Sequence, residues 1–182
     1  MKKVLSLLGV LMFLTAAALF ADKSPVPKLK KYYSANSNYC FLVLPGGDGV
    51  PCKGTLYQTG YKAGLLTLWS ANLVNPVSPL KVIVPDNGKY VVTFDDWDSP
   101  GITENMIVIY GASGKMVKRF SIGDFVNNKL LQDIPESKDG YAWLGKTWFE
   151  KDGEVLGFEI ILMNEDGNKT VKLLLKTGER TE

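Results

Sequence analysis

From Tyr32 onward, the chain consists of short runs rich in Val, Ile, Leu and aromatic residues, and clusters of Gly, Asn, Asp and Pro separate these runs. Apolar runs of this length, bounded by turn-forming residues, are typical of β-strands. The sequence predicts strands at 38–44, 53–58, 64–70, 80–84, 89–94, 105–110, 115–121, 141–149, 154–163 and 169–176. Only residues 122–133 look helical. The pattern therefore predicts an all-β fold.

Three tyrosines, Tyr39, Tyr90 and Tyr141, follow one another at a spacing of 51 residues. Each follows a cluster of turn-forming residues and opens an apolar run. A fixed period in this range indicates a repeated supersecondary unit. We therefore expect residues 32–182 to form a single domain of three blade-like antiparallel units, arranged as an incomplete propeller-like stack. The alternative is a β-sandwich in which three hairpins fall at similar spacing by chance.

The segment 85–92, Pro-Asp-Asn-Gly-Lys-Tyr-Val-Val, is similar to the turn-and-strand signature of bacterial WD40-like β-propeller blades. The similarity centres on residues 80–121, where Ile107–Tyr110 and Gly114–Val117 look like later strands of such a blade. The resemblance implies a binding scaffold and supplies no catalytic residue. Closed propellers have about four to eight blades. Three units thus imply either an open stack or two chains that complete one ring.

The N-terminus has the order of a secretory signal peptide. Two lysines precede the uncharged apolar run Val4–Phe20, and small residues lead up to Ala21. We expect residues 1–21 to be removed after Ala21, residues 22–31 to form a linker, and the mature protein to be secreted or periplasmic. An uncleaved anchor is the alternative, because a run of this length is at the lower limit for crossing a bilayer. After cleavage no stable membrane insertion is expected.

Charge and composition exclude several functions. The whole chain has 21 basic and 19 acidic residues, and loss of the leader with its two lysines makes these numbers equal. A neutral protein has no broad electrostatic attraction for nucleic acid, so no nucleic-acid partner is expected. The chain has no histidine, which excludes Ser-His-Asp catalysis and histidine-ligated zinc. No cofactor and no metal-ligand set is predicted.

The densest polar cluster follows a predicted strand and contains Asp95, Asp96, Trp97, Asp98 and Glu104. These residues are the candidate ligand-binding site, and three interpretations remain open. The carboxylates could bind calcium, although the spacing does not match an EF-hand loop. Two of them could hydrolyse a glycosidic bond, with the tryptophan as a platform for the sugar. The segment could instead be a solvated loop in which the Asp side chains cap turns.

Two cysteines, Cys40 and Cys52, flank a glycine-rich turn. In an oxidising compartment a disulfide between them is expected. The alternative is a pair of buried free thiols.

Taken together, these features favour an exported, non-catalytic binding or interaction scaffold of the bacterial envelope or extracellular space. Its partner would be a protein or an envelope component, or a second copy of the chain that pairs through an exposed sheet edge. The alternatives are a carboxylate-based glycosidase and a calcium-stabilised carbohydrate-binding module, both using the loop from Asp95 to Glu104.

Overall fold

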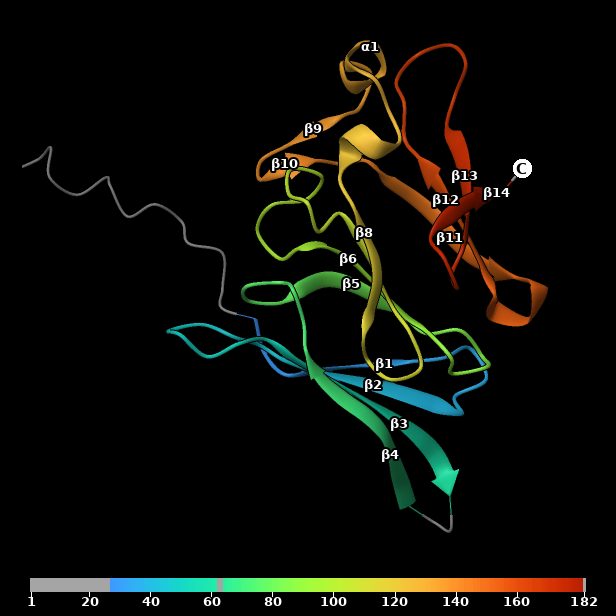
Figure 1. The fold of residues 1–182 in the computed structure, drawn as a ribbon. Coiled ribbons are helices and arrows are strands. Elements are labelled where there is room, and N and C mark those ends of the chain that lie inside the picture. Colours follow the sequence, from blue (N-terminus) through green and yellow to red (C-terminus); the bar gives the residue numbers. More distant parts are fainter. Residues whose placement is uncertain (1–26, 62–63, 182) are drawn as a thin grey trace, which may run out of the picture.

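The computed structural model describes residues 27–61 and 64–181. The expected signal peptide and most of the expected linker lie outside the described residues. The predicted all-β fold is confirmed: three four-stranded antiparallel sheets follow one another along the chain, and each keeps its strands in chain order (Figure 1). The described part of the chain contains no helix that is both long and apolar enough to span a membrane.

Each sheet is built from one continuous stretch of chain. The first sheet contains β1 (Lys30–Tyr33), β2 (Tyr39–Leu44), β3 (Lys53–Tyr61) and β4 (Gly64–Asn72). The second contains β5 (Pro79–Ile83), β6 (Val91–Asp96), β7 (Ile107–Tyr110) and β8 (Met116–Phe120). The third contains β11 (Leu144–Glu150), β12 (Val155–Ile160), β13 (Lys169–Leu174) and β14 (Glu179–Thr181). Strand β1 thus begins within the last two residues of the stretch expected to be a linker.

An inserted segment separates the second and third sheets. It contains two short helices and a two-stranded sheet: η1 (Ile122–Asp124), α1 (Asn128–Leu131), β9 (Glu136–Ser137) and β10 (Gly140–Tyr141). The side chain of Asn127 caps α1 by accepting hydrogen bonds from the backbone N–H groups of Lys129 (3.1 Å) and Leu130 (3.0 Å). A second short helix, η2 (Lys151–Gly153), connects β11 to β12.

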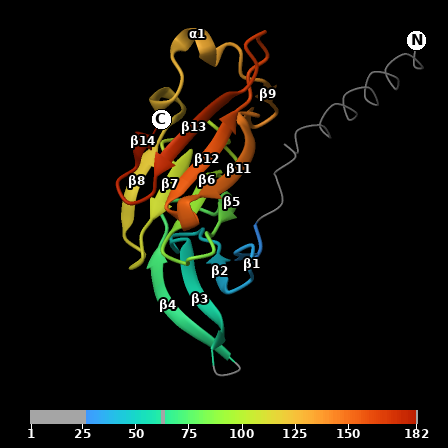
Figure 2. The ribbon, with the colours of Figure 1, turned by 90° about the vertical axis from the view of Figure 1, so that its right-hand side faces the viewer.

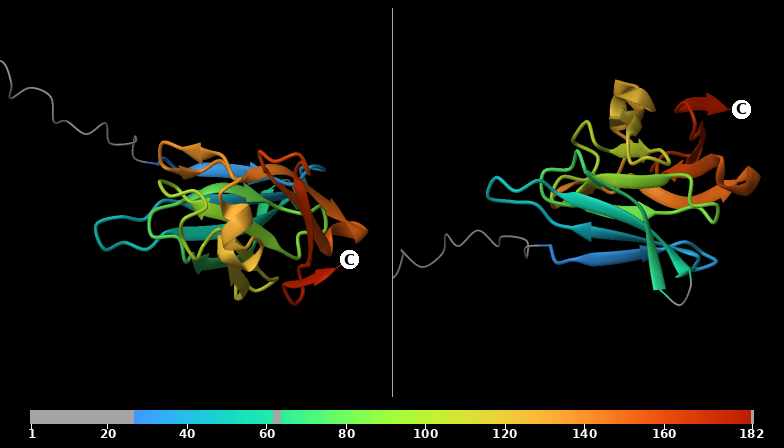
Figure 3. Two further views of the ribbon diagram at one scale, coloured as in Figure 1. Left: turned by 90° about the horizontal axis from the view of Figure 1, so that it is seen from above. Right: turned by 60° about the horizontal axis from the view of Figure 1, so that its bottom comes forward.

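The three sheets stack face to face, with the second sheet in the middle (Figures 2 and 3). One hydrophobic cluster joins the first and second sheets, and another joins the second and third. Residues of β6 alternate between the two clusters: Val91 belongs to the former, and Val92 and Phe94 belong to the latter. Every residue of β6 and β7 is therefore buried, as expected for strands covered on both faces.

The regular spacing of the three tyrosines does not carry through to the third sheet. Tyr39 opens β2 and Tyr90 directly precedes β6, so both lie at the start of a second strand. Tyr141, in contrast, lies in β10, ahead of the first strand of the third sheet. The inserted segment between β8 and β11 is the physical reason, because it lengthens the third unit on its N-terminal side.

The connections between the first and second strands of the three sheets lie next to one another. The backbone N–H of Asn36 donates to Asp86 Oδ1 (2.8 Å), which links the first two sheets. Asn87 Nδ2 donates to the carbonyl oxygen of Asp152 (2.6 Å), which links the second sheet to the third. We call this set of connections, 34–38, 84–90 and 151–154, the turn file. The turn file joins the three sheets at one end of their strands.

The expected disulfide between Cys40 and Cys52 is wrong, because both cysteines are free and buried. Cys52 precedes Lys53, which pairs with Leu44 on β2. Cys40 lies four residues earlier on that strand, a distance of about 13 Å along an extended chain. Disulfides need Cα atoms within about 7 Å. Burial raises the pKa of Cys52 to about 11, so its thiol stays protonated at neutral pH.

Candidate binding cleft

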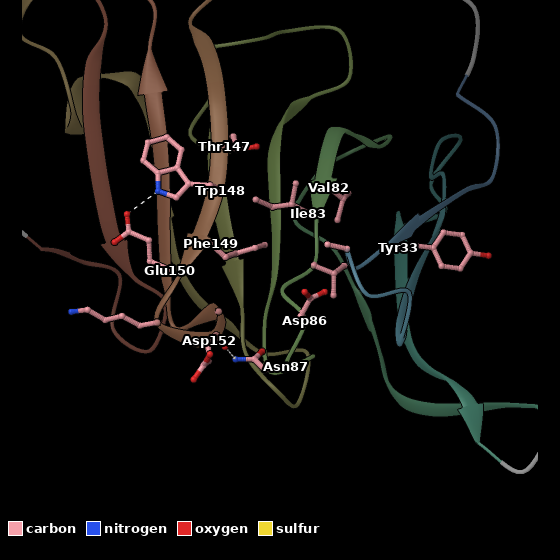
Figure 4. A pocket seen from close by; sticks show the side chains of 14 residues that line it. Tyr33, Val82, Ile83, Asp86, Asn87, Thr147, Trp148, Phe149, Glu150 and Asp152 are labelled. Carbon is pink, nitrogen blue, oxygen red and sulfur yellow. Dashed lines mark hydrogen bonds between the residues drawn. The ribbon is translucent and has the colours of Figure 1, made fainter.

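An open cleft of about 770 Å³ lies between the second and third sheets (Figure 4). Its two long walls are the first strands of these sheets, β5 and β11. Tyr33 of β1 and residues of the turn file complete it. The cleft is therefore assembled from all three units of the chain.

Both wall strands are edge strands. Among the described strands, β5 pairs only with β6, and β11 pairs only with β12. Each strand consequently has one side whose backbone N–H and C=O groups have no partner strand. Near the cleft, Lys81 Nζ on β5 donates to Thr147 Oγ1 on β11 (3.0 Å) and holds the two strands together. Burial lowers the pKa of Lys81, and its ammonium lies 5.5 Å from the ring centroid of Phe94.

The cleft combines an apolar wall with a polar end. Figure 4 shows Phe149 and Ile83 reaching toward one another from β11 and β5. Below them the turn file contributes Asp86, Asn87 and Asp152 to the lining. Apolar surface beside a few placed polar groups is typical of ligand-binding cavities. Asp86 and Asp152 outnumber Lys151 in this part of the lining and give it an acidic character.

Trp148 of β11 also borders the cleft, but its indole turns away from the space between β5 and β11 (Figure 4). Its indole lies flat over Gly157, where an added Cβ would come within 2.2 Å of the ring. The indole Nε1 donates to Glu150 Oε1 (2.8 Å), and Lys172 Nζ lies 2.9 Å from the same oxygen. Hydrogen bonds from Trp148 and Lys172 lower the pKa of Glu150. The outward face of the third sheet thus carries a cluster of paired polar groups at Trp148, Glu150 and Lys172.

Asp95, the first residue of the predicted acidic site, is only 2% exposed. Its carboxylate accepts hydrogen bonds from the backbone N–H of Gly101 (2.6 Å) and from the indole Nε1 of Trp143 (2.9 and 3.0 Å). Burial raises the pKa of Asp95 to about 7, although these hydrogen bonds favour the charged form. The residue lines a smaller cavity of about 400 Å³, together with Lys81 and Tyr141.

The other members of the predicted site separate into buried and exposed groups. Asp96 is buried and accepts hydrogen bonds from Asn75 Nδ2 (2.7 Å) and Asn105 Nδ2 (3.1 Å). Trp97 is half-buried, whereas Asp98 and Glu104 are exposed, and Glu104 forms an ion pair with Arg119. The structure therefore brings Asp95 and Asp96 together beneath the loop and leaves the other two carboxylates at its surface. Within residues 27–61 and 64–181, no group of three or more Cys, Asp or Glu side chains is arranged to hold a metal ion.

The residues of the cleft were not candidates in the sequence. Asp86 and Asp152 were recognised only as parts of turns, and Thr147 and Phe149 only as parts of a strand. One signal could have found them: the turns at 85–88 and 151–153 both connect the first two strands of a unit. Equivalent turns in stacked units lie at the same end, so their polar residues gather there.

Comparison with known proteins identifies no family. No family model matches the chain, and no curated protein matches it. Among solved structures, the chain is similar to the crystal structure of TolB from Acinetobacter baumannii, with a TM-score of 0.44 and 10% sequence identity. The alignment covers 87% of this chain and 32% of the TolB chain. The chain thus spans about a third of the length of the protein it matches.

Proposed function

We propose that this protein is an exported, non-catalytic binding scaffold that holds an extended peptide segment of a partner protein in the cleft between β5 and β11. The observation that carries the proposal is a cavity of about 770 Å³ walled by two strands, each of which pairs on one side only within the part of the chain that the structure describes. An extended segment can form backbone hydrogen bonds with such an edge while its side chains enter the neighbouring cavity. The composition of the cleft defines the peptide that fits it.

The lining favours a peptide with an apolar residue next to a basic one. An apolar side chain fits between Ile83 and Phe149, which face each other across the cavity. A basic side chain one or two positions away would reach Asp86 or Asp152 at the turn file. Charge-assisted hydrogen bonds to carboxylates are stronger than neutral ones, so this pairing would orient the peptide in the cleft.

The enzymatic alternative has less support. A glycosidase needs two carboxyl groups that flank a substrate. Both acceptor oxygens of Asp95 are engaged by Gly101 and Trp143, and Asp96 is engaged by two asparagines. The calcium-stabilised alternative would need several oxygen ligands around one point, and the loop residues Asp98 and Glu104 instead lie in solvent.

Peptide selection tests the proposal directly. The full chain is expressed in a bacterial host and purified from the exported fraction, and N-terminal sequencing is expected to give Asp22 as the first residue. Peptides selected from a random display library are then measured by calorimetry. We expect bound peptides to protect the backbone amides of β5 or β11 from hydrogen exchange.

Two neighbouring aromatic residues on β11 supply matched variants. Phe149→Ala removes a side chain that points into the cleft, and we expect it to weaken peptide binding roughly tenfold or more. Trp148→Ala removes one that points away, and affinity should stay unchanged. Thermal melts establish that both variants are folded. Recovery of no peptide, protection elsewhere, or equal effects of the two substitutions would contradict the proposal.

A further inference from the structure

The three four-stranded sheets present six edge strands: β1, β4, β5, β8, β11 and β14. Exposed edges invite edge-to-edge pairing with the sheet of another folded chain, and charged residues or proline on the edge discourage pairing of this kind. Five of the six edges carry such protection: β1 has Lys30 and Lys31, β5 has Pro79 and Lys81, β8 has Lys118 and Arg119, β11 has Lys146, and β14 has Glu179 and Arg180. Strand β4 has neither a charged residue nor a proline, although its pairing with β3 shifts register between Thr67 and Trp69.

Strand β4 has nine residues, Gly64–Asn72, with neither a charged residue nor a proline. Its first five residues are all exposed. Among them, Leu65 is 59% exposed, Leu66 37% and Leu68 39%. The strand first reaches the interior at Trp69, which belongs to the cluster between the first and second sheets. One half of β4 thus has leucines in contact with water as well as a free edge.

The surroundings of this half-strand leave room for a partner. The end of β3 and the start of β4 project beyond the other described elements, and none of these elements covers them (Figures 1 and 2). A ribbon of only two strands is marginally stable in water by itself. An added strand would cover the leucines and satisfy the unpaired backbone groups of β4.

We infer that two copies of this chain pair through β4, antiparallel and related by a two-fold axis. The two first sheets then form one continuous eight-stranded sheet. The second copy is favoured as the occupant because a two-fold axis brings the same strand against itself. With no charged residue in β4, no like charges face each other across the pairing. The leucines of one copy meet those of the other.

A single pair of strands buries less surface than a standard protein–protein interface. We therefore expect a reversible dimer that dissociates on dilution. Sedimentation velocity of the exported protein over a range of concentrations measures the dimer dissociation constant. Leu66→Lys places a charge at the pairing and should raise this constant roughly tenfold or more.

The matched control is Met116→Lys, because Met116 is an apolar residue that is 46% exposed on the protected edge strand β8. This substitution should leave the dissociation constant unchanged. A sample that is monomeric at every concentration overturns the inference. A dimer that survives Leu66→Lys, or that Met116→Lys weakens equally, overturns it as well.

Cross-linking gives a second readout that does not depend on a destabilising substitution. Both native thiols are buried, so a new surface cysteine is the reactive one. Single substitutions Leu65→Cys and Thr67→Cys are compared with Lys118→Cys on β8. We expect at least one of the β4 cysteines to give a disulfide-linked dimer under mild oxidation and the β8 cysteine to give none. The opposite pattern overturns the inference. The pairing and the peptide cleft lie on different strands, so either can fail without the other.

Discussion

At the scale of single residues, Asp95 of the candidate ligand-binding site makes hydrogen bonds that hold the fold together. Its carboxylate holds the indole of the buried Trp143 and the backbone of Gly101. It adopts a left-handed backbone conformation, with φ of 53°, which Asp tolerates better than most residues. The residue therefore fixes the start of the loop at 97–104 against the inserted segment that carries Trp143.

The pKa of Asp95 predicts how stability depends on pH. Because burial raises this pKa from 3.8 to about 7, the folded protein retains a proton that the unfolded chain releases. Stability should therefore decrease as pH rises from about 4 to about 7, by up to about 4 kcal/mol. Urea unfolding at several pH values measures the decrease.

Asp95→Asn removes the titrating group and should flatten this pH dependence. Asp98→Asn is the control, because Asp98 is exposed and its loss should leave the slope as it was. A wild-type protein whose unfolding free energy is constant between pH 4 and 7 would contradict the role assigned to Asp95.

At the scale of elements, the turn file depends on glycines that make close contacts. Gly88 has φ of 64°, and an added Cβ would lie 2.2 Å from the ring of Tyr39 in the neighbouring sheet. Gly167 has a similar φ of 73°, but no atom lies within 4 Å of the position of its Cβ. Substitution of each glycine by alanine therefore separates the stability cost of backbone strain from the cost of disturbing a contact between two units.

We expect Gly167→Ala to cost about 1 kcal/mol, because it introduces only the left-handed strain. Gly88→Ala should cost roughly 1 to 3 kcal/mol more, because Tyr39 has to move out of its place between the sheets. Chemical denaturation of both variants measures the difference. Equal costs would show that the first two connections of the turn file do not need this close packing.

The strands were largely predictable from the sequence, and the reason is local. Alternating apolar runs and the Asn-Gly turn at 87–88 are properties of neighbouring residues. The disulfide was predicted wrongly because it depends on the register between β2 and β3. The position of Tyr141 was predicted wrongly because it depends on the inserted segment between β8 and β11. Spacing in sequence shows neither. The burial of Asp95 could not be predicted for a similar reason: no residue near Asp95 in the sequence indicates that the indole of Trp143 contacts its carboxylate.

At the scale of the whole molecule, the middle sheet connects two cores. Strands β6 and β7 contribute residues to both hydrophobic clusters. Loosening of either outer sheet would expose a face of the middle one. The cleft also depends on the whole molecule, because its walls come from separate units. No sequence pattern within one unit could therefore have predicted it.

The shared middle sheet predicts cooperative unfolding. Leu156→Ala removes a fully buried side chain from the cluster between the second and third sheets, and we expect a loss of about 2 to 5 kcal/mol. Trp69 reports on the cluster between the first and second sheets, and Trp143 reports on the other. In variants that keep one of these tryptophans and replace the others by Phe, both fluorescence midpoints should fall together.

Leu80→Ala is the control, because Leu80 is 44% exposed, and it should change neither midpoint by much. A Trp69 midpoint that stays in place while the Trp143 midpoint falls would show that the units unfold independently, as repeats do when their interfaces are weak.

The order of strands within each sheet also bears on how the chain acquires its structure. Every strand of the three large sheets pairs with its neighbour in sequence, so only short loops close before the first hydrogen bonds form. Short loops lose little entropy on closure, and chains rich in local pairings fold fast. Each sheet can therefore form soon after its own residues become available, and the first can be complete before the last is synthesised.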